Sequence, residues 1–495
     1  MSITSASLTP VKFSESEPIR QSFAQNRLWF LYQMDPQNGQ HNIVFRLVVD
    51  GPALDKKRLT AAFNKLVWRH KILRTGYSTT ETGSVQKLVS NLTIPLEVIN
   101  FSETDPENEN SLITAWLQAE QKKPFDLSSG KVIRTYLLKR RNNLQEIIYT
   151  IHHIAFDGRS NEIFRTELSE LYSQTFGGQE NIDGEEINSL EDIASPDYAD
   201  FSVWERNYLT ADIIQSDLDF WRDHLHNFPQ QLNFKDRSDN GYAVKTENFR
   251  FFISNEIADN FKRSAKQQKQ TLFNALTTLF NLWIYHISGQ DRFLIGTDVH
   301  GRDFPELANI MGFFVNQLII KCDLSNDPTL KEFLAGTRTS IKHSLAHHQV
   351  PFDVLVSSLA PERSLHRPPF FQVKFNYRPY RFIVDRIGES QIIESQIING
   401  LAGFDLLLDL MEGKHGIEVN LQYNQHLFTA TDIQCFASGW LNLLTHFETL
   451  IDAPISEIDQ QLSRWGDTYL QGLQQSHSQQ NRARLKNSSR KILSF

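Results

Sequence analysis

The chain has 495 residues, of which 40% are hydrophobic and 22% are charged, and its formal net charge is -8. This length favours two domains or lobes over one core, and the acidic balance argues against a broad nucleic-acid-binding surface. The polar N-terminus lacks the apolar segment of a signal peptide, and no stretch is apolar enough to predict a membrane span. The two cysteines, Cys322 and Cys435, fit no metal or redox spacing and favour buried free thiols in the cytoplasm.

The first half of the chain predicts a mixture of helices and strands. Residues 1–18 are rich in Ser, Thr and Pro and predict disorder. The expected elements that follow are a helix over 22–34, a strand over 42–49, an amphipathic helix from Asp55, and a β-hairpin formed by 132–139 and 146–152. A turn at Phe156-Asp157-Gly158 then precedes a helix, for which Ser160 is the expected cap.

The second half continues the same mixture after an acidic, glycine-containing segment over 177–191, which predicts a linker. We therefore expect one lobe over 19–176 and a second over 192–462. The expected helices cover 212–224, 256–267, 272–287 and 431–450, and the expected strands cover 292–297, 370–377 and 417–423. Residues 463–495 become rich in Gln, Ser and Asn and then basic, which predicts a flexible basic tail.

The strongest chemical signal is the run His152-His153-Ile154-Ala155-Phe156-Asp157-Gly158 at the end of a predicted strand. Consecutive strand residues point to opposite faces, so one histidine can enter a reaction channel while the other packs behind it. A neutral imidazole can accept a proton from an amine or hydroxyl near pH 7. The Asp157 carboxylate can pair with an arginine, and Gly158 would let a backbone N–H approach a reacting group.

Two other interpretations of the histidines stay open at this point. The pair at 152 and 153 could be a buried, hydrogen-bonded structural pair. His343 and His347 have the i, i+4 spacing of metal ligands on a helix, but Ser344 replaces the glutamate of a zincin and no third ligand is evident. We therefore expect no bound metal.

Further segments accompany the histidine motif in a fixed order. They are 22–31 (SFAQNRLWFL), 69–75 (RHKILRT), 197–204 (DYADFSVW), 295–302 with 311–316 (IGT to GR, then MGFFVN), 347–352 (HHQVPF) and 369–375 (PFFQVKF). Each segment alone is a weak signal, but the ordered set is specific. It resembles the motifs of the condensation domains of nonribosomal peptide synthetases, and more loosely those of chloramphenicol acetyltransferase-like acyltransferases.

The resemblance implies an α/β (α+β) fold with two chloramphenicol acetyltransferase-like lobes, arranged as a V-shaped pseudo-dimer around a central channel. It implies a free-standing condensation enzyme that forms an amide between a carrier-bound acyl or peptidyl thioester and an amine. The chain itself would bind no cofactor, because partner carrier proteins supply the phosphopantetheine arms. The expected partners are donor and acceptor carrier proteins, other synthetase modules, or a small amine or alcohol, with no nucleic acid or membrane, and the chain is expected to be a monomer.

The resemblance also assigns roles to individual residues. His153 is expected to face the channel and to accept a proton from the amine or hold it for attack, with His152 and Gly158 beside it. Asp157 is expected to be structural, with Arg302 as its partner and Arg27 as the second choice. Asn316 and Arg159 are expected at the channel or substrate. Arg159 departs from the family, which often has Trp at this position, and it could contact a phosphate or an acidic carrier surface.

Alternatives within and outside this chemistry stay open. An alcohol acceptor would give an ester, and an epimerisation domain shares the fold and both histidines. A non-catalytic recruitment module is the third alternative, and fold-level analogy alone does not exclude it. No phosphate-binding loop and no carrier-type Gly-Gly-x-Ser site occurs in the sequence, so the chain is expected to work with partners in trans.

Overall fold

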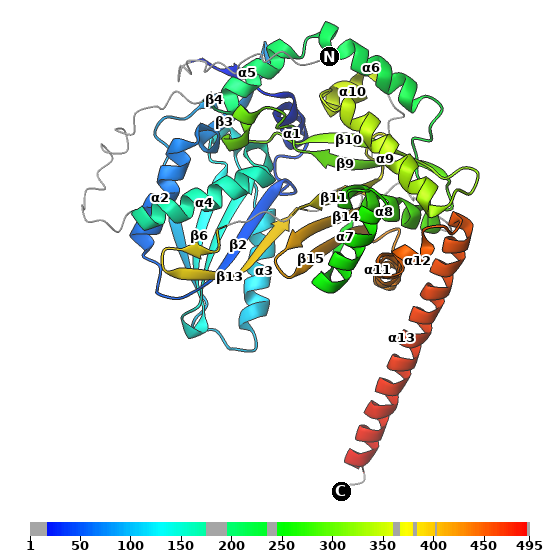
Figure 1. Ribbon diagram of the computed structural model, residues 1–495. Helices are drawn as coiled ribbons and strands as arrows, with labels where there is room; N and C mark the ends of the chain where they lie inside the picture. Colours follow the sequence, from blue (N-terminus) through cyan, green and yellow to red (C-terminus); the bar gives the residue numbers. More distant parts are fainter. Residues whose placement is uncertain are drawn as a thin grey trace.

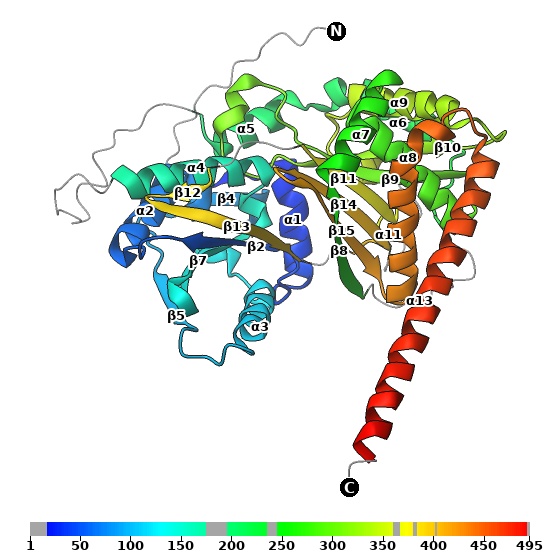
Figure 2. The same ribbon diagram turned by 60° about the horizontal axis from the view of Figure 1, so that its bottom comes forward.

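Figure 1 shows the chain in a computed structural model, which describes residues 17–174, 196–234, 245–359, 367–379, 384–400 and 403–492. Helices and strands alternate and form three β-sheets. Two six-stranded sheets lie in separate halves of the molecule, each with helices packed on it (Figures 1 and 2). The expected mixed α/β class is therefore confirmed.

The first six-stranded sheet carries the histidine motif. Its strand order is β12 (Arg386–Ile387), β13 (Ser390–Asn399), β2 (Asn42–Asp50), β7 (Gln145–His152), β6 (Ile133–Lys139) and β5 (Leu96–Asn100). Alternate residues of β2 face opposite sides. Phe45 packs with α2 (Lys56–Arg69) and α4 (Gly158–Gln174), whereas Val44 packs with α3 (Glu109–Lys122) on the other face. Strands β6 and β7 are antiparallel neighbours, so the expected hairpin is confirmed.

A small sheet with the order β1 (Ile19–Arg20), β4 (Gly83–Leu88) and β3 (Thr75–Thr80) lies beside two helices, α1 (Phe23–Met34) and α5 (Tyr198–Tyr208). Ser22 begins α1, because its hydroxyl accepts a hydrogen bond from the Gln25 N–H. The same hydroxyl lies 2.9 Å from the Tyr198 hydroxyl, which fastens α5 to the start of α1. Short 3-10 helices cover Lys71–Arg74, Leu127–Ser129 and Arg141–Asn143.

The second six-stranded sheet has the order β10 (Asn316–Asp323), β9 (Arg292–Val299), β11 (Val373–Arg378), β14 (Leu406–Gly413), β15 (Gly416–Asn424) and β8 (Thr246–Ser254). One large apolar core joins it to α7 (Asn255–Gln267), α8 (Leu272–Ser288), α9 (Leu330–Ala346), α11 (Ala430–Thr445), α12 (Phe447–Leu450) and α13 (Ile455–Ile492). A separate cluster joins β9 and β10 to α6 (Ala211–Leu225) and α10 (Phe352–Leu359).

Segments from the second half of the chain join the first sheet and its core, which departs from the expected division into 19–176 and 192–462. Strand β13 pairs with β2 in an antiparallel register, so residues from late in the chain extend the first sheet. Tyr198 and Phe201 of α5 belong to the first apolar core, as do Phe313 and Phe314. The expected linker 177–191 lies outside the described residues, and so do residues 1–16 of the expected disordered N-terminus.

Most expected elements of the second half are confirmed to within a few residues, with two differences of extent. The expected strand over 370–377 begins only at Val373, because Phe370 has a positive φ of 68° that no strand residue adopts. The expected helix over 431–450 is two helices, α11 and α12, separated at His446. The expected core helix is α8, whose residues are mostly buried.

The expected cap Ser160 is corrected by the structure, and so is the expected lack of regular structure after Leu462. Helix α4 already begins at Gly158, and the Asp157 carboxylate accepts a hydrogen bond from the Ser160 N–H. Helix α13 continues without a break to Ile492 (Figure 2). Its first turns are held because Leu462 and Trp465 pack against the second core, and Gln, Arg, Lys and Leu favour helix beyond them. No helix among the described residues is long and apolar enough to cross a membrane.

Candidate active site

His153 occupies the point where the chain leaves the first sheet. Strand β7 ends at His152, a single 3-10 turn covers His153–Ala155, and α4 begins at Gly158. The His153 N–H donates to the His41 carbonyl oxygen at 2.8 Å, just beyond the last residue pair of β2 and β7. The backbone of this turn is therefore fixed by the neighbouring strand.

The imidazole of His153 has a defined tautomer. Its Nδ1 lies 2.6 Å from the Phe156 carbonyl oxygen. Because a carbonyl only accepts, Nδ1 carries the hydrogen and the neutral ring keeps its lone pair on Nε2. Burial lowers the pKa of His153, and the nearby Phe156 carbonyl, Asp157 and Asp298 oppose this shift only in part. The ring is therefore neutral near pH 7, with a basic nitrogen available.

His152 is oriented away from this position, into the first core. It is 3% exposed and its ring meets Tyr32, His41 and Phe125 edge to face. Its Nδ1 accepts a hydrogen bond from the Ile154 N–H at 3.2 Å. Burial, followed by the charges of neighbouring histidines and an arginine, lowers its pKa well below the ordinary value. His152 thus holds the turn from inside.

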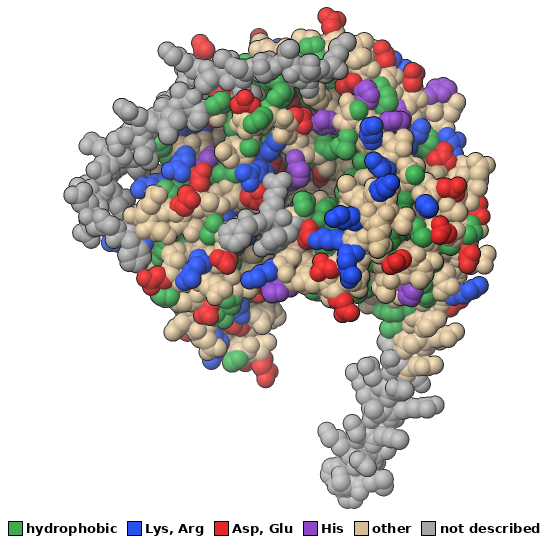
Figure 3. Space-filling view, in the orientation of Figure 1, with side chains coloured by type: hydrophobic (Ala, Val, Ile, Leu, Met, Phe, Trp, Pro, Cys, Tyr) green, Lys and Arg blue, Asp and Glu red, His purple; other side chains and the backbone are tan. Residues whose placement is uncertain are grey.

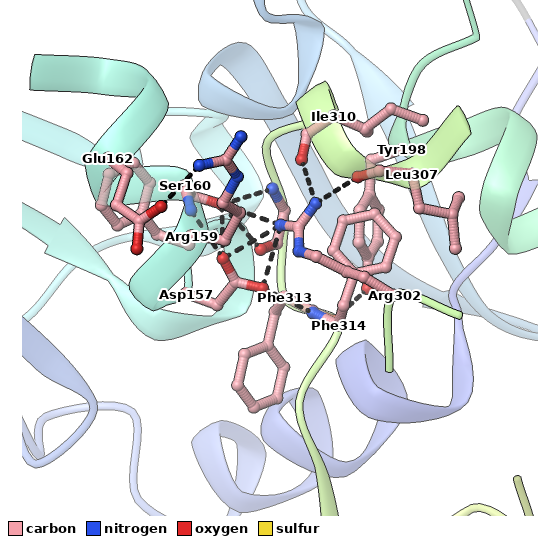
Figure 4. A network of polar contacts seen from close by, with 12 residues as sticks. Asp157, Arg159, Ser160, Glu162, Tyr198, Arg302, Leu307, Ile310, Phe313 and Phe314 are labelled. Atoms are coloured by element: carbon pink, nitrogen blue, oxygen red, sulfur yellow. Dashed lines mark hydrogen bonds and ion pairs between the residues drawn. The ribbon is translucent and has the colours of Figure 1, made fainter. Parts of the chain in front are cut away.

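Asp157 is the centre of a buried polar network (Figure 4). Both of its carboxylate oxygens lie 3.0 Å from Nη2 of Arg302. It also accepts hydrogen bonds from the Ser160 N–H at 2.8 Å and from the Phe314 N–H at 3.3 Å. Its side chain is 1% exposed and that of Arg302 is 8% exposed. The carboxylate therefore joins the start of α4 to a segment of the chain more than a hundred residues away.

Arg302 completes the connection between the two halves. Its guanidinium donates to the Ile310 carbonyl oxygen at 2.7 Å and lies over the Phe314 ring, 4.0 Å from its centroid. The hydroxyl of Ser160 accepts a hydrogen bond from the Gly312 N–H at 2.9 Å. Gly312 is required here, because a Cβ would lie 1.8 Å from the Tyr198 ring. The loop that follows β9 is thereby packed against the His153 turn.

Phe313 places this loop against His153 itself. The two ring centroids are 4.7 Å apart, at an angle of 63°. The same Phe313 ring carries the guanidinium of Arg27, whose Cζ lies 5.8 Å from its centroid. The His153 ring thus lies at the contact between the first sheet and the loop after β9.

Gly158 presents an open backbone position next to these groups. It is the first residue of α4 and is exposed, and a Cβ built on it meets no described atom within 4 Å. Its backbone N–H is one of the first four of the helix, which have no partner within the helix. The helix dipole gives this end a partial positive charge, so the N–H can donate to an oxygen that gains negative charge.

The remaining expected site residues are held by contacts within the protein. Arg27 lies 4.0 Å from Asp353 and does not contact Asp157. The Asn316 amide donates to the carbonyl oxygens of His348 and Val350 at 2.9 and 2.8 Å. Its oxygen accepts from the N–H groups of residues 317 and 352, so its polar atoms are occupied by backbone. Asn316 lines a cavity of about 70 Å³ between α1, α5 and α10. Its amide group, however, already makes hydrogen bonds to the backbone.

Arg159 is engaged in the same way. Its Nε donates to the Ala308 carbonyl oxygen at 3.0 Å, and its Nη1 lies 2.5 Å from Glu162. Ala308 belongs to a 3-10 helix, Pro305–Asn309. The cation therefore holds the loop after β9 against α4. A phosphate bound by Arg159 would have to share the guanidinium with the Ala308 carbonyl and the Glu162 carboxylate.

The sequence interpretation missed three groups near His153. They are His41, Phe313 and Asp298, the last on β9 with a charge that acts on the His153 ring. Burial lowers the pKa of His41 to about 4, with the charges of His153 and Arg27 adding to the shift. The one available signal was the position of His41, one residue before a predicted strand. The sequence did not predict that this strand pairs with the strand that ends at His152, so the contact of His41 with His153 could not be expected.

The alternative metal site at His343 and His347 finds no support among the described residues. They contain no group of three or more His, Cys, Asp or Glu side chains arranged to hold a metal ion. His347 instead pairs with Asp217 at 2.6 Å, and its ring stacks on Phe220 at a centroid distance of 3.7 Å. These contacts fasten α9 to α6.

Comparison with known proteins places the fold and the sequence in one group. The family described as Condensation domain matches residues 16–464. A linear gramicidin synthase polypeptide of Brevibacillus parabrevis is 30% identical over 480 residues, which are 94% of this chain and 9% of that protein. Bacitracin synthase 1 of Bacillus licheniformis is 27% identical over 454 residues, 90% of this chain and 8% of that protein. The chain thus spans less than a tenth of the length of these relatives.

Solved structures agree on the fold. The condensation domain of the monacolin K polyketide synthase has a TM-score of 0.76 at 18% identity, covering 89% of this chain and 99% of that chain. The X-domain from teicoplanin biosynthesis has a TM-score of 0.75 at 22% identity, covering 91% of this chain and 99% of that chain. At these identities the likeness shows the fold alone.

Proposed function

Because this chain belongs to the condensation domain family of peptide synthetases, a family of acyltransferases that form amide bonds, we propose that it joins a carrier-bound acyl or peptidyl thioester to an amine. The observation that carries this proposal is the neutral His153 ring, with Nδ1 committed to the Phe156 carbonyl and the Nε2 lone pair left over. The proposed partners are donor and acceptor carrier proteins in the cytoplasm, and a soluble amine is an alternative acceptor.

The proposed reaction needs little more than positioning and one proton acceptor. The amine nitrogen attacks the thioester carbonyl, a C–N bond forms, and the C–S bond breaks. His153 Nε2 accepts the proton that the amine loses, and the departing thiolate of the phosphopantetheine arm takes up a proton to leave as a thiol. Because a thioester is already activated, holding the two reactants in line supplies most of the acceleration. The two arms would enter a channel between the lobes of a V-shaped arrangement, one from each side.

The other site residues would support this step from fixed positions. The Gly158 N–H, at the start of α4, would donate to the carbonyl oxygen as it gains negative charge. Asp157 and Arg302 would hold the turn and the loop after β9 together, so that His153 keeps its orientation. His152 would brace the turn from the core side.

Gly158→Ala should leave the fold intact and reduce amide formation about 10-fold or more. The new methyl group meets no described protein atom, and alanine favours a helix over glycine, so the melting temperature should stay or rise. The methyl group would stand where the thioester carbonyl approaches the helix N-terminus, and oxyanion contacts of this kind are worth about 100-fold in rate. Steady-state kinetics together with a thermal melt check this, and unchanged kinetics would remove Gly158 from the reacting region.

The rate should depend on pH through His153. Only the neutral ring can accept a proton, and burial lowers its pKa below the ordinary value of 6.5. The rate should therefore be constant near neutral pH and fall as the pH drops through a midpoint below 6.5. The profile of kcat/KM should be measured with a weakly basic amine that stays unprotonated across the range. A midpoint above 6.5 would contradict a buried, neutral base.

Three other activities that this fold could support can be distinguished by experiment. Incubation with one loaded carrier and no acceptor identifies an epimerisation domain, because only that activity changes the stereochemistry of the donor by itself. An alcohol in place of the amine tests ester formation. A recruitment module would leave the thioester unchanged with either acceptor.

A further inference from the structure

An ion pair joins the loop after β9 (residues 300–315) to the turn after α9 (residues 347–351). Nε2 of His348 lies 3.0 Å from both carboxylate oxygens of Asp303. Nδ1 of the same ring lies 2.6 Å from the Leu345 carbonyl oxygen on α9. Figure 3 shows histidine side chains gathered on the part of the surface where α6, α9 and α10 lie in Figure 1.

The contacts of His348 define its protonation state. Both ring nitrogens face groups that only accept hydrogen bonds, so both carry a hydrogen and the ring is a cation. The Asp303 hydrogen bond raises the pKa of His348, and burial opposes this shift only in part. The other charged groups around the ring come from α6, α1, α5 and α10, and they are Asp217, Arg27, Glu205 and Asp353.

The turn that carries His348 is a fixed support. The Asn316 amide donates to the carbonyl oxygens of His348 and Val350. The Trp221 indole donates to the His347 carbonyl oxygen at 2.9 Å. Because the backbone of the turn is held in this way, the ion pair restrains the loop on the Asp303 side.

The loop transmits this restraint toward His153. Gly301, two residues before Asp303, has a positive φ of 56°, and its Cα packs so closely on the Phe314 carbonyl oxygen that no Cβ fits between them. The start and the end of the loop therefore move together. Phe313, next to Phe314, contacts the His153 ring at a centroid distance of 4.7 Å.

We propose that His348, as a cation, is a positioning residue for the reaction at His153. It holds Asp303, and through Asp303 the loop after β9, so that Phe313 keeps its place against the His153 ring. The effect on the rate rests on the proposed function. A neutral His348 ring has one N–H and cannot donate to both Leu345 and Asp303, so loss of the proton releases the loop.

The direction of the pH dependence follows from the raised pKa of His348. The ion pair contributes fully below the ordinary pKa of 6.5, and its contribution is lost as the pH rises through the higher pKa of the folded state. Amide formation should therefore decline on the alkaline side, in addition to the decline on the acidic side that His153 causes.

Histidine-selective NMR tests the positioning contact without turnover, by following the Cε1–H signals of His348 and His153 against pH. The His348 signal should titrate with a midpoint above 6.5 in the wild type and with a lower midpoint in Asp303→Asn. The His153 signal should shift with the same midpoint as His348, because the Phe313 ring beside it moves. His343→Gln is the matched control, since His343 is an exposed histidine on α9 and should leave both midpoints unchanged.

The pH profile of kcat/KM, measured with the weakly basic amine, tests the effect on the rate. The alkaline decline should be about 2- to 5-fold in the wild type, the range that a partly exposed ion pair can supply. His348→Gln cannot titrate and should lose this decline. His348→Lys keeps a cation and should move the decline to higher pH.

A His348 midpoint at or below 6.5, or a His153 signal that does not follow it, would overturn the proposal. An alkaline decline that stays the same in His348→Gln would overturn it as well. Coupled NMR shifts in a protein that forms no amide would count against the proposed function and support the positioning contact.

Discussion

Replacing His153 by alanine should reduce amide formation about 100-fold or more, with the fold retained. A positioned general base contributes about 100- to 10,000-fold. His153 is the described histidine whose Nδ1 is held by the Phe156 carbonyl oxygen, which leaves its Nε2 as the proton acceptor. Among the aromatic side chains described, the ring contacts Phe313, and alanine keeps the backbone N–H that fixes the turn to the His41 carbonyl oxygen, so removal of the ring should cost little stability. Single-turnover rates and circular dichroism check both halves of this expectation.

The matched control is His226→Ala, which removes an exposed histidine at the end of α6 and should not change the rate. His152→Ala should act differently, because His152 is buried and holds the Ile154 N–H. The His152→Ala variant should have a lower melting temperature, and its rate should fall because the structure of the turn is lost. A folded His153 variant with wild-type turnover would end the proton-acceptor role.

Replacing Asp157 by alanine should lower the free energy of unfolding by about 3–5 kcal/mol, the scale for breaking a buried ion pair from one side. The change would leave the Arg302 cation almost fully buried without its carboxylate, and it would remove the acceptor for the N–H groups of Ser160 and Phe314. Amide formation should fall in parallel, because the loop after β9 is no longer fastened to the His153 turn. Urea unfolding followed by fluorescence measures the stability change.

The control for this prediction is Asp219→Ala. Asp219 pairs with Arg222 on α6, where the two side chains are 53% and 52% exposed. Exposed pairs contribute between about 0 and 1 kcal/mol, so this variant should unfold like the wild type. If Asp157→Ala also unfolded like the wild type, the carboxylate would not be what joins the two halves.

Local features of the fold could be predicted from the sequence. The helix after Ser22 and the helix after Asp55 were predictable because each starting residue is a good N-cap and each helix carries an apolar stripe. The hairpin formed by β6 and β7 followed from two apolar runs around a polar turn. These elements are determined by residues close together in the chain.

Pairings between distant segments could not be predicted. The exchange of β13 into the first sheet depends on a register between residues more than three hundred positions apart, and no local pattern encodes it. The extent of α13 was missed because the packing of Trp465 on the second core, a tertiary contact, extends a segment that composition alone suggests is unfolded.

For the candidate site, the sequence identified chemical types better than geometry. The motif located His153 and Asp157, but the tautomer of His153 depends on the Phe156 carbonyl, which no residue type reveals. Asn316 illustrates the reverse case, because its residue type suits substrate binding while the fold commits all of its hydrogen bonds to backbone.

Intact-protein mass spectrometry of an acyl-loaded carrier protein, incubated with this enzyme and a panel of amines, tests the proposed reaction most directly. We expect that the acyl group leaves the carrier, that an amide appears whose mass equals the acyl group plus the amine minus one hydrogen, and that both changes require the amine and His153. A carrier that keeps its acyl group with every amine offered, or one that loses it equally fast with the His153→Ala variant, would contradict the proposed reaction.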